Sequence, residues 1–135
     1  MNIFGIGTDI VNTKRIEKSI KMYGNKFKNK IFTKKEIRYC ENKKNPAPFY
    51  AKRFAAKEAF TKALGTGIRK GISLKDIEIF NDTSGKPNIK LRGVVNNLLK
   101  KKIKRNILLF RSDSIYLIFL RTTFSSFIKS SELII

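Results

Sequence analysis

The pattern of apolar and polar positions predicts a short strand followed by a helix at the start of the chain. Residues 2–7, NIFGIG, are apolar with two glycines, which is typical of a buried strand that enters a turn. Thr13 can cap a helix that begins near Lys14, where isoleucines recur one helical turn apart between outward lysines. Gly24 and Asn25 predict the end of this helix.

Two further helices are predicted before residue 65. Thr33 and Glu36 have the spacing of a capping box, which predicts the start of a second helix. A loop is expected over 42–48, since its two prolines oppose helix continuation. A third helix is predicted over 49–64, with Gly65 in the position where glycine ends helices. Its apolar positions cover more than one stripe, so we expect the buried central helix of the domain.

The second half of the chain alternates between strands and one basic helix. The predicted elements are a strand over 77–80, a turn-rich loop over 81–87, a returning strand over 88–91, a helix over 94–103, and strands over 108–110 and 115–120. This order predicts a single α+β domain over residues 1–135, with the helices packed on one side of an antiparallel sheet.

Composition limits the class of protein. The chain has 135 residues, 41% of them hydrophobic, which is enough for one folded core. It contains no apolar run long enough for a membrane span and no signal-peptide pattern. The single cysteine, Cys40, cannot form an internal disulfide, so we expect a reducing, cytoplasmic location. The absence of histidine excludes histidine acid–base chemistry and histidine metal ligands.

The net charge of +20 and the pI near 10.3 predict an anionic partner. Nucleic acid, a membrane surface, an acidic protein and a phosphorylated small molecule all meet that description. Lysine far outnumbers arginine, and an AT-rich genome would drift toward this composition without selection for binding. A small basic nucleic-acid-binding protein therefore stays open as an alternative, although it leaves two isolated acids unexplained.

Those two acids, Asp9 and Glu58, are the strongest candidates for chemistry. Asp9 follows the first apolar strand, and Glu58 lies among alanines and phenylalanines of the predicted central helix. Mg²⁺ is typically held by one or two carboxylates plus substrate phosphates, so the pair predicts a magnesium site if the fold brings it together. The simpler alternatives are a cap or turn role for Asp9 and an ion pair between Glu58 and Lys62.

Three cations on the same predicted helix, Arg53, Lys57 and Lys62, can be directed at a polyphosphate. The segment Gly65-Thr66-Gly67 that follows allows a backbone to approach a phosphate or an adenine closely. Each feature also has a simpler interpretation, since a single basic residue is commonly a solvated charge and helix termination explains Gly65.

Taken together, these motifs resemble a known enzyme family. The segments GIGTDIV (Gly5–Val11), Lys14-Arg15-Ile16 and RFAAKEAFTKALGTG (Arg53–Gly67) are similar to those of bacterial holo-acyl-carrier-protein synthase. This family is the small, trimeric class of 4′-phosphopantetheinyl transferases. The resemblance covers residues 2–91 in order, and it implies a trimer with active sites at the subunit interfaces.

The resemblance also implies a reaction, the transfer of 4′-phosphopantetheine from coenzyme A to a serine of apo acyl carrier protein, in support of fatty acid biosynthesis. Residues matching Asp9 and Glu58 bind Mg²⁺ together with the coenzyme A pyrophosphate in the family. The lysine matching Lys62 neutralises charge as adenosine 3′,5′-bisphosphate leaves, and Glu58 is the expected acceptor of the serine proton. The candidate coenzyme A ligands are Arg53, Lys57, Lys62, Gly65, Thr66 and Gly67.

The basic first helix is the predicted docking surface for the carrier protein, because acyl carrier proteins are acidic. Arg15 matches the family position that contacts the carrier. Lys18 and Lys21 are inferred only from their charge and their helical spacing. With this partner, neither nucleic acid nor a membrane is needed to explain the positive charge.

Beyond about Lys102 the chain departs from the family pattern. Ser112 and Asp113 are a candidate remnant of a family strand, Leu117 and Phe119 stand where small alanines are usual, and a tail over 124–135 extends past the usual end. A diverged functional end, a decaying gene and a change of reading frame are all compatible with this departure. Because these strands contribute trimer contacts in the family, we expect weak activity or low stability.

Overall fold

Four α-helices and six strands form the part of the chain that this computed structural model describes, residues 2–68, 71–102, 106–112, 117–119 and 132–134. The helices are α1 (Thr13–Ile31), α2 (Lys34–Glu41), α3 (Pro46–Ala63) and α4 (Gly93–Lys102), with a short 3-10 helix, η1 (Leu74–Asp76). The strands are β1 (Asn2–Asp9), β2 (Ile77–Asn81), β3 (Pro87–Leu91), β4 (Asn106–Ser112), β5 (Leu117–Phe119) and β6 (Glu132–Ile134). Within these ranges, every helix is too short or too polar to cross a bilayer.

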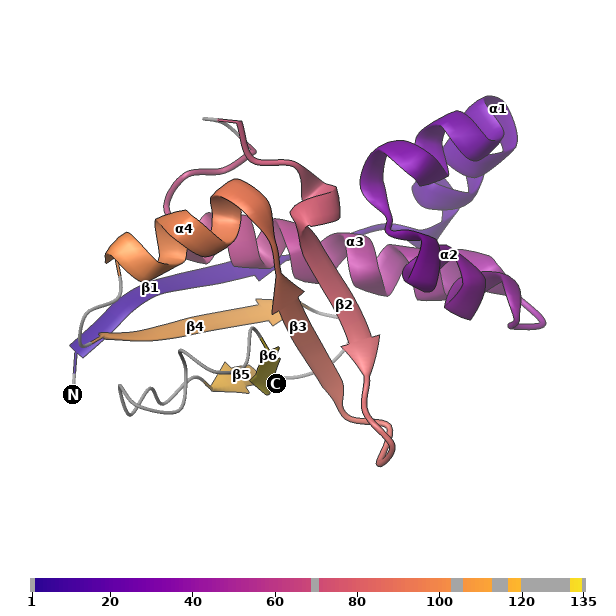
Figure 1. Ribbon diagram of the computed structural model, residues 1–135. Helices are drawn as coiled ribbons and strands as arrows, with labels where there is room; N and C mark the ends of the chain where they lie inside the picture. Colours follow the sequence, from indigo (N-terminus) through magenta and orange to yellow (C-terminus); the bar gives the residue numbers. More distant parts are fainter. Residues whose placement is uncertain (1, 69–70, 103–105, 113–116, 120–131, 135) are drawn as a thin grey trace.

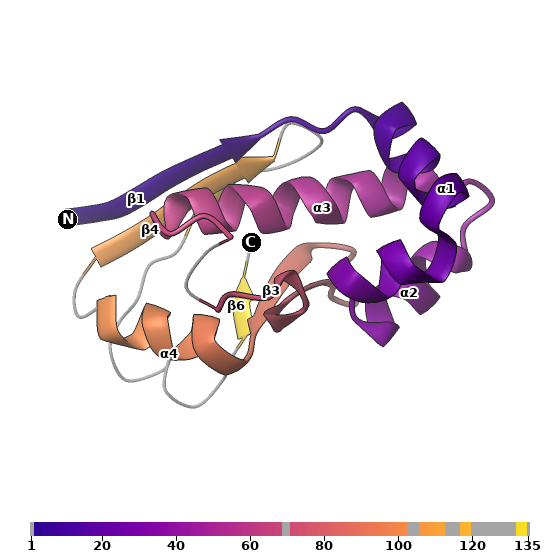
Figure 2. The same cartoon turned by 90° about the horizontal axis from the view of Figure 1, so that it is seen from above.

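The strands form two three-stranded sheets, and α3 contacts both of them (Figure 1). In one sheet, β1 pairs in parallel with β4, and β4 pairs antiparallel with β5. In the other, the β2–β3 hairpin continues antiparallel into β6. Seen from above, α3 lies between the two sheets, with α1 and α2 at one end of it (Figure 2). The predicted α+β class with antiparallel pairing is confirmed. The strands form two sheets with α3 between them, rather than one sheet with the helices on one side, and β1 pairs in parallel with β4.

The helix boundaries differ from the sequence prediction in three places. The N-cap of α1 is Asn12, whose Oδ1 accepts from the amide of Lys14 at 2.9 Å, and Thr13 is the first helical residue rather than the cap. α1 does not end at Gly24; it kinks there, with φ 52° and ψ −129°, and continues to Ile31. Glycine tolerates this backbone conformation because it has no Cβ. α3 begins at Pro46 rather than after the prolines, since the first helical position needs no N–H donor. The capping box of α2 and the left-handed Gly65 after α3, with φ 70°, are confirmed.

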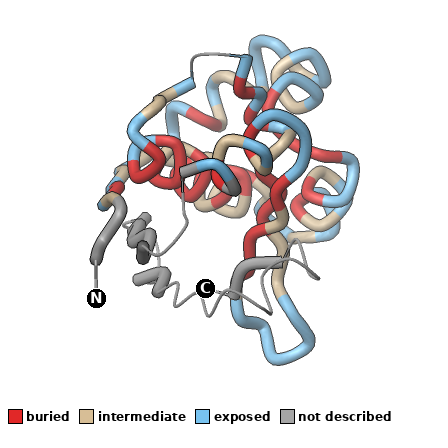
Figure 3. Tube along the Cα trace, turned by 60° about the vertical axis from the view of Figure 1, so that its left-hand side comes forward, coloured by how far each residue is buried: buried red, intermediate tan, exposed pale blue. Residues whose placement is uncertain are grey.

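The buried residues gather around α3, as the buried segments at the centre of the tube in Figure 3 show. Eleven of the eighteen α3 residues are buried, so the helix has almost no free face, as its apolar pattern predicts. Fully buried apolar side chains come from α3 itself, from its C-terminal end, from the residue after α1, and from β2, β3 and α4. Phe32, Tyr50, Phe60, Leu64, Ile77, Ile89, Val95 and Leu99 are among them.

β1 passes α3 at a distance that only glycine permits. A Cβ added to Gly5 would overlap the carbonyl oxygen of Ala63, and one added to Gly7 would overlap that of Ala59. The helix residues at these contacts are alanines, which let the two backbones approach. Because of this close approach, β1 runs along the last turns of α3 before the strand ends at Asp9.

The last third of the chain, in which the sequence predicts divergence from the family pattern, supplies β4 to the sheet. β4 contains the strand predicted over 108–110, and β5 covers part of the strand predicted over 115–120, whereas β6 was not predicted. The register of the parallel pair places Ser112 opposite Asp9. Asp113 and most of the tail lie outside the described residues.

Candidate active site

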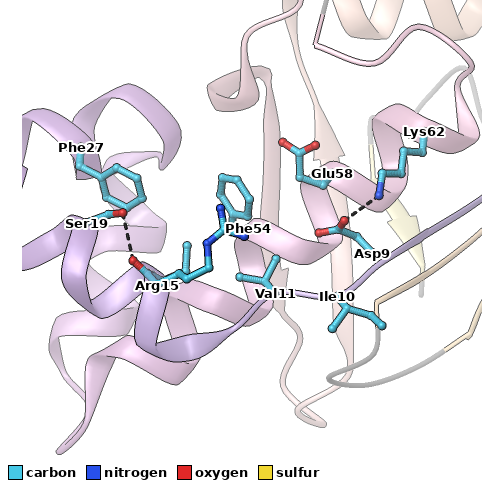
Figure 4. A pocket seen from close by; sticks show the side chains of 10 residues that line it. Asp9, Ile10, Val11, Arg15, Ser19, Phe27, Phe54, Glu58 and Lys62 are labelled. Atoms are coloured by element: carbon cyan, nitrogen blue, oxygen red, sulfur yellow. Dashed lines mark hydrogen bonds and ion pairs between the residues drawn. The ribbon is translucent and has the colours of Figure 1, made fainter.

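A pocket of about 360 Å³ opens between the end of β1, α1 and α3 (Figure 4). Its lining residues are Asp9, Ile10, Val11, Arg15, Ile16, Ser19, Phe27, Phe54, Glu58 and Lys62. Asp9, Glu58 and Lys62 lie together at one end, and Phe27 and Arg15 lie toward the other. Both predicted metal ligands and the predicted catalytic lysine are therefore brought into one cavity by elements far apart in the sequence.

Lys62 forms its ion pair with Asp9. The Nζ of Lys62 donates to Asp9 Oδ1 at 2.7 Å and to the carbonyl oxygen of Thr8 at 3.1 Å. The Asp9 side chain is only 14% exposed, whereas that of Lys62 is 51% exposed. Such a pair on the pocket rim holds the two groups in place, and the lysine retains access to a molecule entering the pocket.

Glu58 is the second carboxylate of the pocket, and its surroundings disfavour its ionised form. Burial raises the pKa of Glu58, the negative charge of Asp9 raises it further, and Lys62 opposes these effects. An opposite charge beside a carboxylate favours its ionised form. A cation bound beside Glu58 would therefore oppose the effects of burial and of Asp9 on its pKa.

The donor chemistry of this pair fits Mg²⁺. Magnesium takes oxygen ligands, keeps several waters and is commonly held by one or two carboxylates together with substrate phosphates. No three acidic or thiol side chains gather into a metal site within the described ranges. Two carboxylates beside an open pocket match the arrangement in which substrate phosphates complete the ligand set.

Lys57 does not face the pocket, which corrects its prediction as a phosphate ligand. Its side chain is 0% exposed, and its Nζ donates to Glu36 Oε2 at 2.7 Å and to the carbonyl oxygens of Ile31 and Leu74 at 2.9 and 3.0 Å. Burial lowers the pKa of Lys57, and Glu36 opposes that shift. All three donors of the ammonium are used inside the protein, so none is left for coenzyme A.

Arg53 is also buried away from the pocket, on the side of α3 that faces the β2–β3 hairpin. It is 4% exposed, its Nη2 donates to Asn81 Oδ1 at 3.0 Å, and its guanidinium lies 4.0 Å from the ring centre of Tyr39. Its Nε is buried without a hydrogen-bond partner among the described residues. Arg53 does not line the pocket that holds Asp9, which corrects its prediction as a coenzyme A ligand.

The Gly65-Thr66-Gly67 segment mainly ends α3. The amide of Gly65 donates to the carbonyl of Lys62 at 2.9 Å, and that of Gly67 donates to Thr61 at 3.2 Å. Both glycines have positive φ, which lets the chain turn back over the helix end. The hydroxyl of Thr66 has no partner within the described part of the chain, so it is the polar group of this segment that remains free.

Of the predicted docking residues on α1, only Arg15 lines the pocket. Lys18 and Lys21 are exposed on the same helix, and Lys21 pairs with Glu17 at 2.9 Å. Lys21 also lines a second cavity, between α1, α2 and the start of α3. Arg15 and Lys21 therefore face different sides of α1, and only Arg15 stands beside the pocket that holds Asp9.

Sequence reasoning missed the apolar wall of the pocket and the partner of Lys57. Val11, Phe27 and Phe54 line the cavity, but apolar residues on helices give no signal that separates a pocket wall from a core. Glu36 was identified only as a capping residue. A stronger signal existed, since a lysine on a helix that is buried all round requires an acid nearby.

A sequence model of the 4′-phosphopantetheinyl transferase superfamily, ACPS, matches residues 5–132 of this chain. The chain belongs to this superfamily. The matched region includes the two segments that carry Asp9 and Glu58, and it extends through β4 and β5.

Individual relatives agree with this assignment. The holo-[acyl-carrier-protein] synthase of Protochlamydia amoebophila is 52% identical over 94 residues, which cover 70% of this chain and 77% of that protein. The crystal structure of the Neisseria meningitidis synthase aligns with a TM-score of 0.71 at 41% identity, over 79% of this chain and 86% of that chain. The Bacillus anthracis synthase, solved in complex with CoA (3′,5′-ADP), aligns with a TM-score of 0.61 at 43% identity, over 69% and 79%. The predicted fold and the enzyme family, holo-acyl-carrier-protein synthase, are confirmed.

Proposed function

We propose that this chain transfers the 4′-phosphopantetheine group of coenzyme A to a serine of an apo acyl carrier protein, in a Mg²⁺-dependent reaction that supports fatty acid biosynthesis. The convergence of Asp9, Glu58 and Lys62 on one pocket carries the proposal. The relatives named for this activity, and the coenzyme A complex of one of them, support it. The proposal treats residues 1–135 as one catalytic domain, working in the cytoplasm.

Asp9 and Glu58 would hold the magnesium ion in this proposal. When bound, the ion neutralises phosphate oxygens and so favours attack at phosphorus. Lys62 supplies a second positive charge at the same end of the pocket, since its half-exposed ammonium lies beside Asp9. A dianionic pyrophosphate placed there meets positive charge from the ion and from the protein.

The chemical step exchanges one P–O bond for another. The serine oxygen bonds to the phosphorus that carries the pantetheine arm, and the bond from this phosphorus to adenosine bisphosphate breaks. The serine proton passes to a carboxylate oxygen of Glu58, and Lys62 neutralises the charge on the leaving phosphate. Transfer of this kind depends mainly on positioning and on charge neutralisation, which these residues provide.

Further coenzyme A contacts are proposed at Gly65, Thr66 and Gly67, whereas Arg53 is 4% exposed and does not line the pocket. The unpartnered hydroxyl of Thr66 supports this part of the proposal, because buried polar groups are normally hydrogen-bonded. Lys57 is not among these contacts, since its ammonium is fully used in the core.

We also propose that the acidic carrier docks on Arg15, Lys18 and Lys21, and that the enzyme is a homotrimer with sites between subunits. The position of Arg15 on the pocket wall supports the docking surface. Ile6 and Ile10 support the trimer, because they are 66% and 77% exposed on either side of Asp9. Large apolar side chains exposed beside a functional site commonly mark an interface.

The direct test is the mass of an apo acyl carrier protein after incubation with the chain, coenzyme A and Mg²⁺. We expect the carrier to gain one phosphopantetheine group, and we expect chelation of the metal or Glu58→Gln to prevent the gain. An unmodified carrier with the folded wild-type chain would refute the proposal. Salt titration of binding to nucleic acid tests the alternative, since such binding weakens steeply with salt.

A further inference from the structure

The ammonium of Lys57 joins three segments at one buried point. It donates to Ile31, whose carbonyl ends α1; to Glu36, in the first turn of α2; and to Leu74, in η1. The carbonyl of Ile31 is one of those that a helix end leaves without a helical partner, so Lys57 supplies its donor. We call Lys57, Glu36 and these two carbonyls the buried hub.

Glu36 extends the hub to a fourth element. Its Oε2 accepts from Lys57 and from the amide of Thr33, and its Oε1 accepts from the amide of Ile79 at 3.0 Å. The Glu36 side chain is 1% exposed, so these bonds are shielded from water. The hub therefore fixes α1, α2 and β2 against α3.

The hub stands directly behind the pocket. Lys57 is followed by Glu58, and successive helical residues point about 100° apart, so one faces the core while the other faces the pocket. Ile31 lies one turn after Phe27, which lines the opposite wall. Gly24 kinks α1 just before this turn, so the turn is joined to the rest of the helix through a permissive residue.

We propose that Lys57 is a positioning residue, which sets the part of the α1 wall that follows the kink, at Phe27, against the α3 wall that bears Glu58. This inference rests on the proposed function, because it assigns α1 to carrier docking. Misplacement of the α1 wall changes how the carrier serine is presented. The metal and coenzyme A side, built on β1 and α3, keeps its geometry because β1 packs on α3 independently of the hub.

The test compares the double variant Glu36→Gln/Lys57→Met with Lys75→Met. The double variant removes both charges, so neither is left buried without its partner. Lys75 is exposed beside Leu74 and provides a matched loss of one lysine outside the hub. We expect the KM for apo carrier to rise about tenfold in the double variant, within the range for ångström-scale misplacement, with the KM for coenzyme A unchanged. Lys75→Met is expected to leave both constants unchanged.

A purely structural role of Lys57 predicts a different result. Partial unfolding would lower the apparent kcat through the loss of folded enzyme and leave the KM for carrier unaltered. An unaltered KM for carrier in the folded double variant overturns the inference. If that variant does not fold, Glu36→Gln alone, which keeps the two carbonyl contacts of Lys57, must show the same change in reduced form.

Hydrogen exchange provides a readout that does not depend on activity. The turn of α1 that precedes Ile31 should exchange faster in the double variant than in Lys75→Met, because its last carbonyl loses its donor. Equal exchange overturns the inference. Failure of the wild-type chain to modify any carrier instead refutes the proposed function, so the two failures are distinguishable.

Discussion

Replacing Gly7 by alanine should separate β1 from α3 and disable the pocket. A Cβ at this position would overlap the carbonyl oxygen of Ala59 and would lie 2.5 Å from the amide nitrogen of Ala63. Both are backbone atoms of a buried helix, so neither can move aside as a flexible side chain would. The strand itself must shift away from α3.

The cost follows from this overlap. Forcing extra atoms into a packed interior typically costs about 1–3 kcal/mol. For a domain of this size, each kcal/mol lowers the Tm by roughly 4 °C, at fixed protein concentration. Asp9 lies two residues beyond Gly7 on the displaced strand, and misplacement by about 1 Å can lower turnover about a hundredfold. We therefore expect the loss of transferase activity to exceed the loss of folded protein.

Urea denaturation followed by far-UV circular dichroism gives the free energy of unfolding, and the mass shift of the carrier gives turnover. Thr8→Ala is the matched control, because Thr8 is the next residue of β1 and its side chain is exposed. We expect this control to stay within about 0.5 kcal/mol of wild type. A Gly7→Ala variant with the stability and turnover of Thr8→Ala would refute our account of the close approach.

Four other predictions follow from the contacts described above. Lys57→Met should cost about 3–5 kcal/mol by urea denaturation, because it strands Glu36 without its cation. Lys62→Met, which breaks an exposed pair, should cost at most about 1 kcal/mol and yet abolish turnover. Equal losses of stability in Lys57→Met and Lys62→Met would contradict the assignment of Lys57 to the core and Lys62 to the pocket. Burial and Asp9 raise the pKa of Glu58, so the folded chain holds this proton more tightly than the unfolded chain, and stability falls as the pH rises through the folded pKa. Glu58→Gln should remove that slope in metal-free melts, and an unchanged slope would count against it. Burial raises the pKa of the Cys40 thiol to about 11, so the native chain should resist alkylation at neutral pH, as mass spectrometry can check; labelling before unfolding would disprove this.

The sequence carried enough information to predict the elements around the pocket and two of its acids. Asp9 and Glu58 stood out because a carboxylate in an apolar segment needs a compensating group, whatever the fold. The capping box and Gly65 were predictable for a similar reason, since local hydrogen bonding determines them. Features that depend on a few neighbouring residues are accessible from sequence.

The features that were missed depend on long-range neighbours. Arg53 and Lys57 have the spacing of solvent-directed cations, and nothing local shows that Asn81 and Glu36 lie opposite them. The parallel pairing of β1 with β4 joins residues about a hundred positions apart, which periodicity cannot indicate. The sequence predicts a helix end at Gly24, where the structure has a kink, because glycine serves both to end a helix and to kink it.

The burial of α3 has a consequence for how this chain can change over generations. Eleven of the eighteen residues of α3 are buried, against two of the nineteen in α1. A substitution on α3 therefore meets a packed neighbour almost wherever it falls, whereas most positions of α1 accept a new polar side chain at little cost. Mutational drift toward lysine can accumulate on α1 and is largely barred from α3. We therefore expect α3, the helix that bears Glu58 and Lys62, to retain sequence similarity to relatives longer than the rest of the chain.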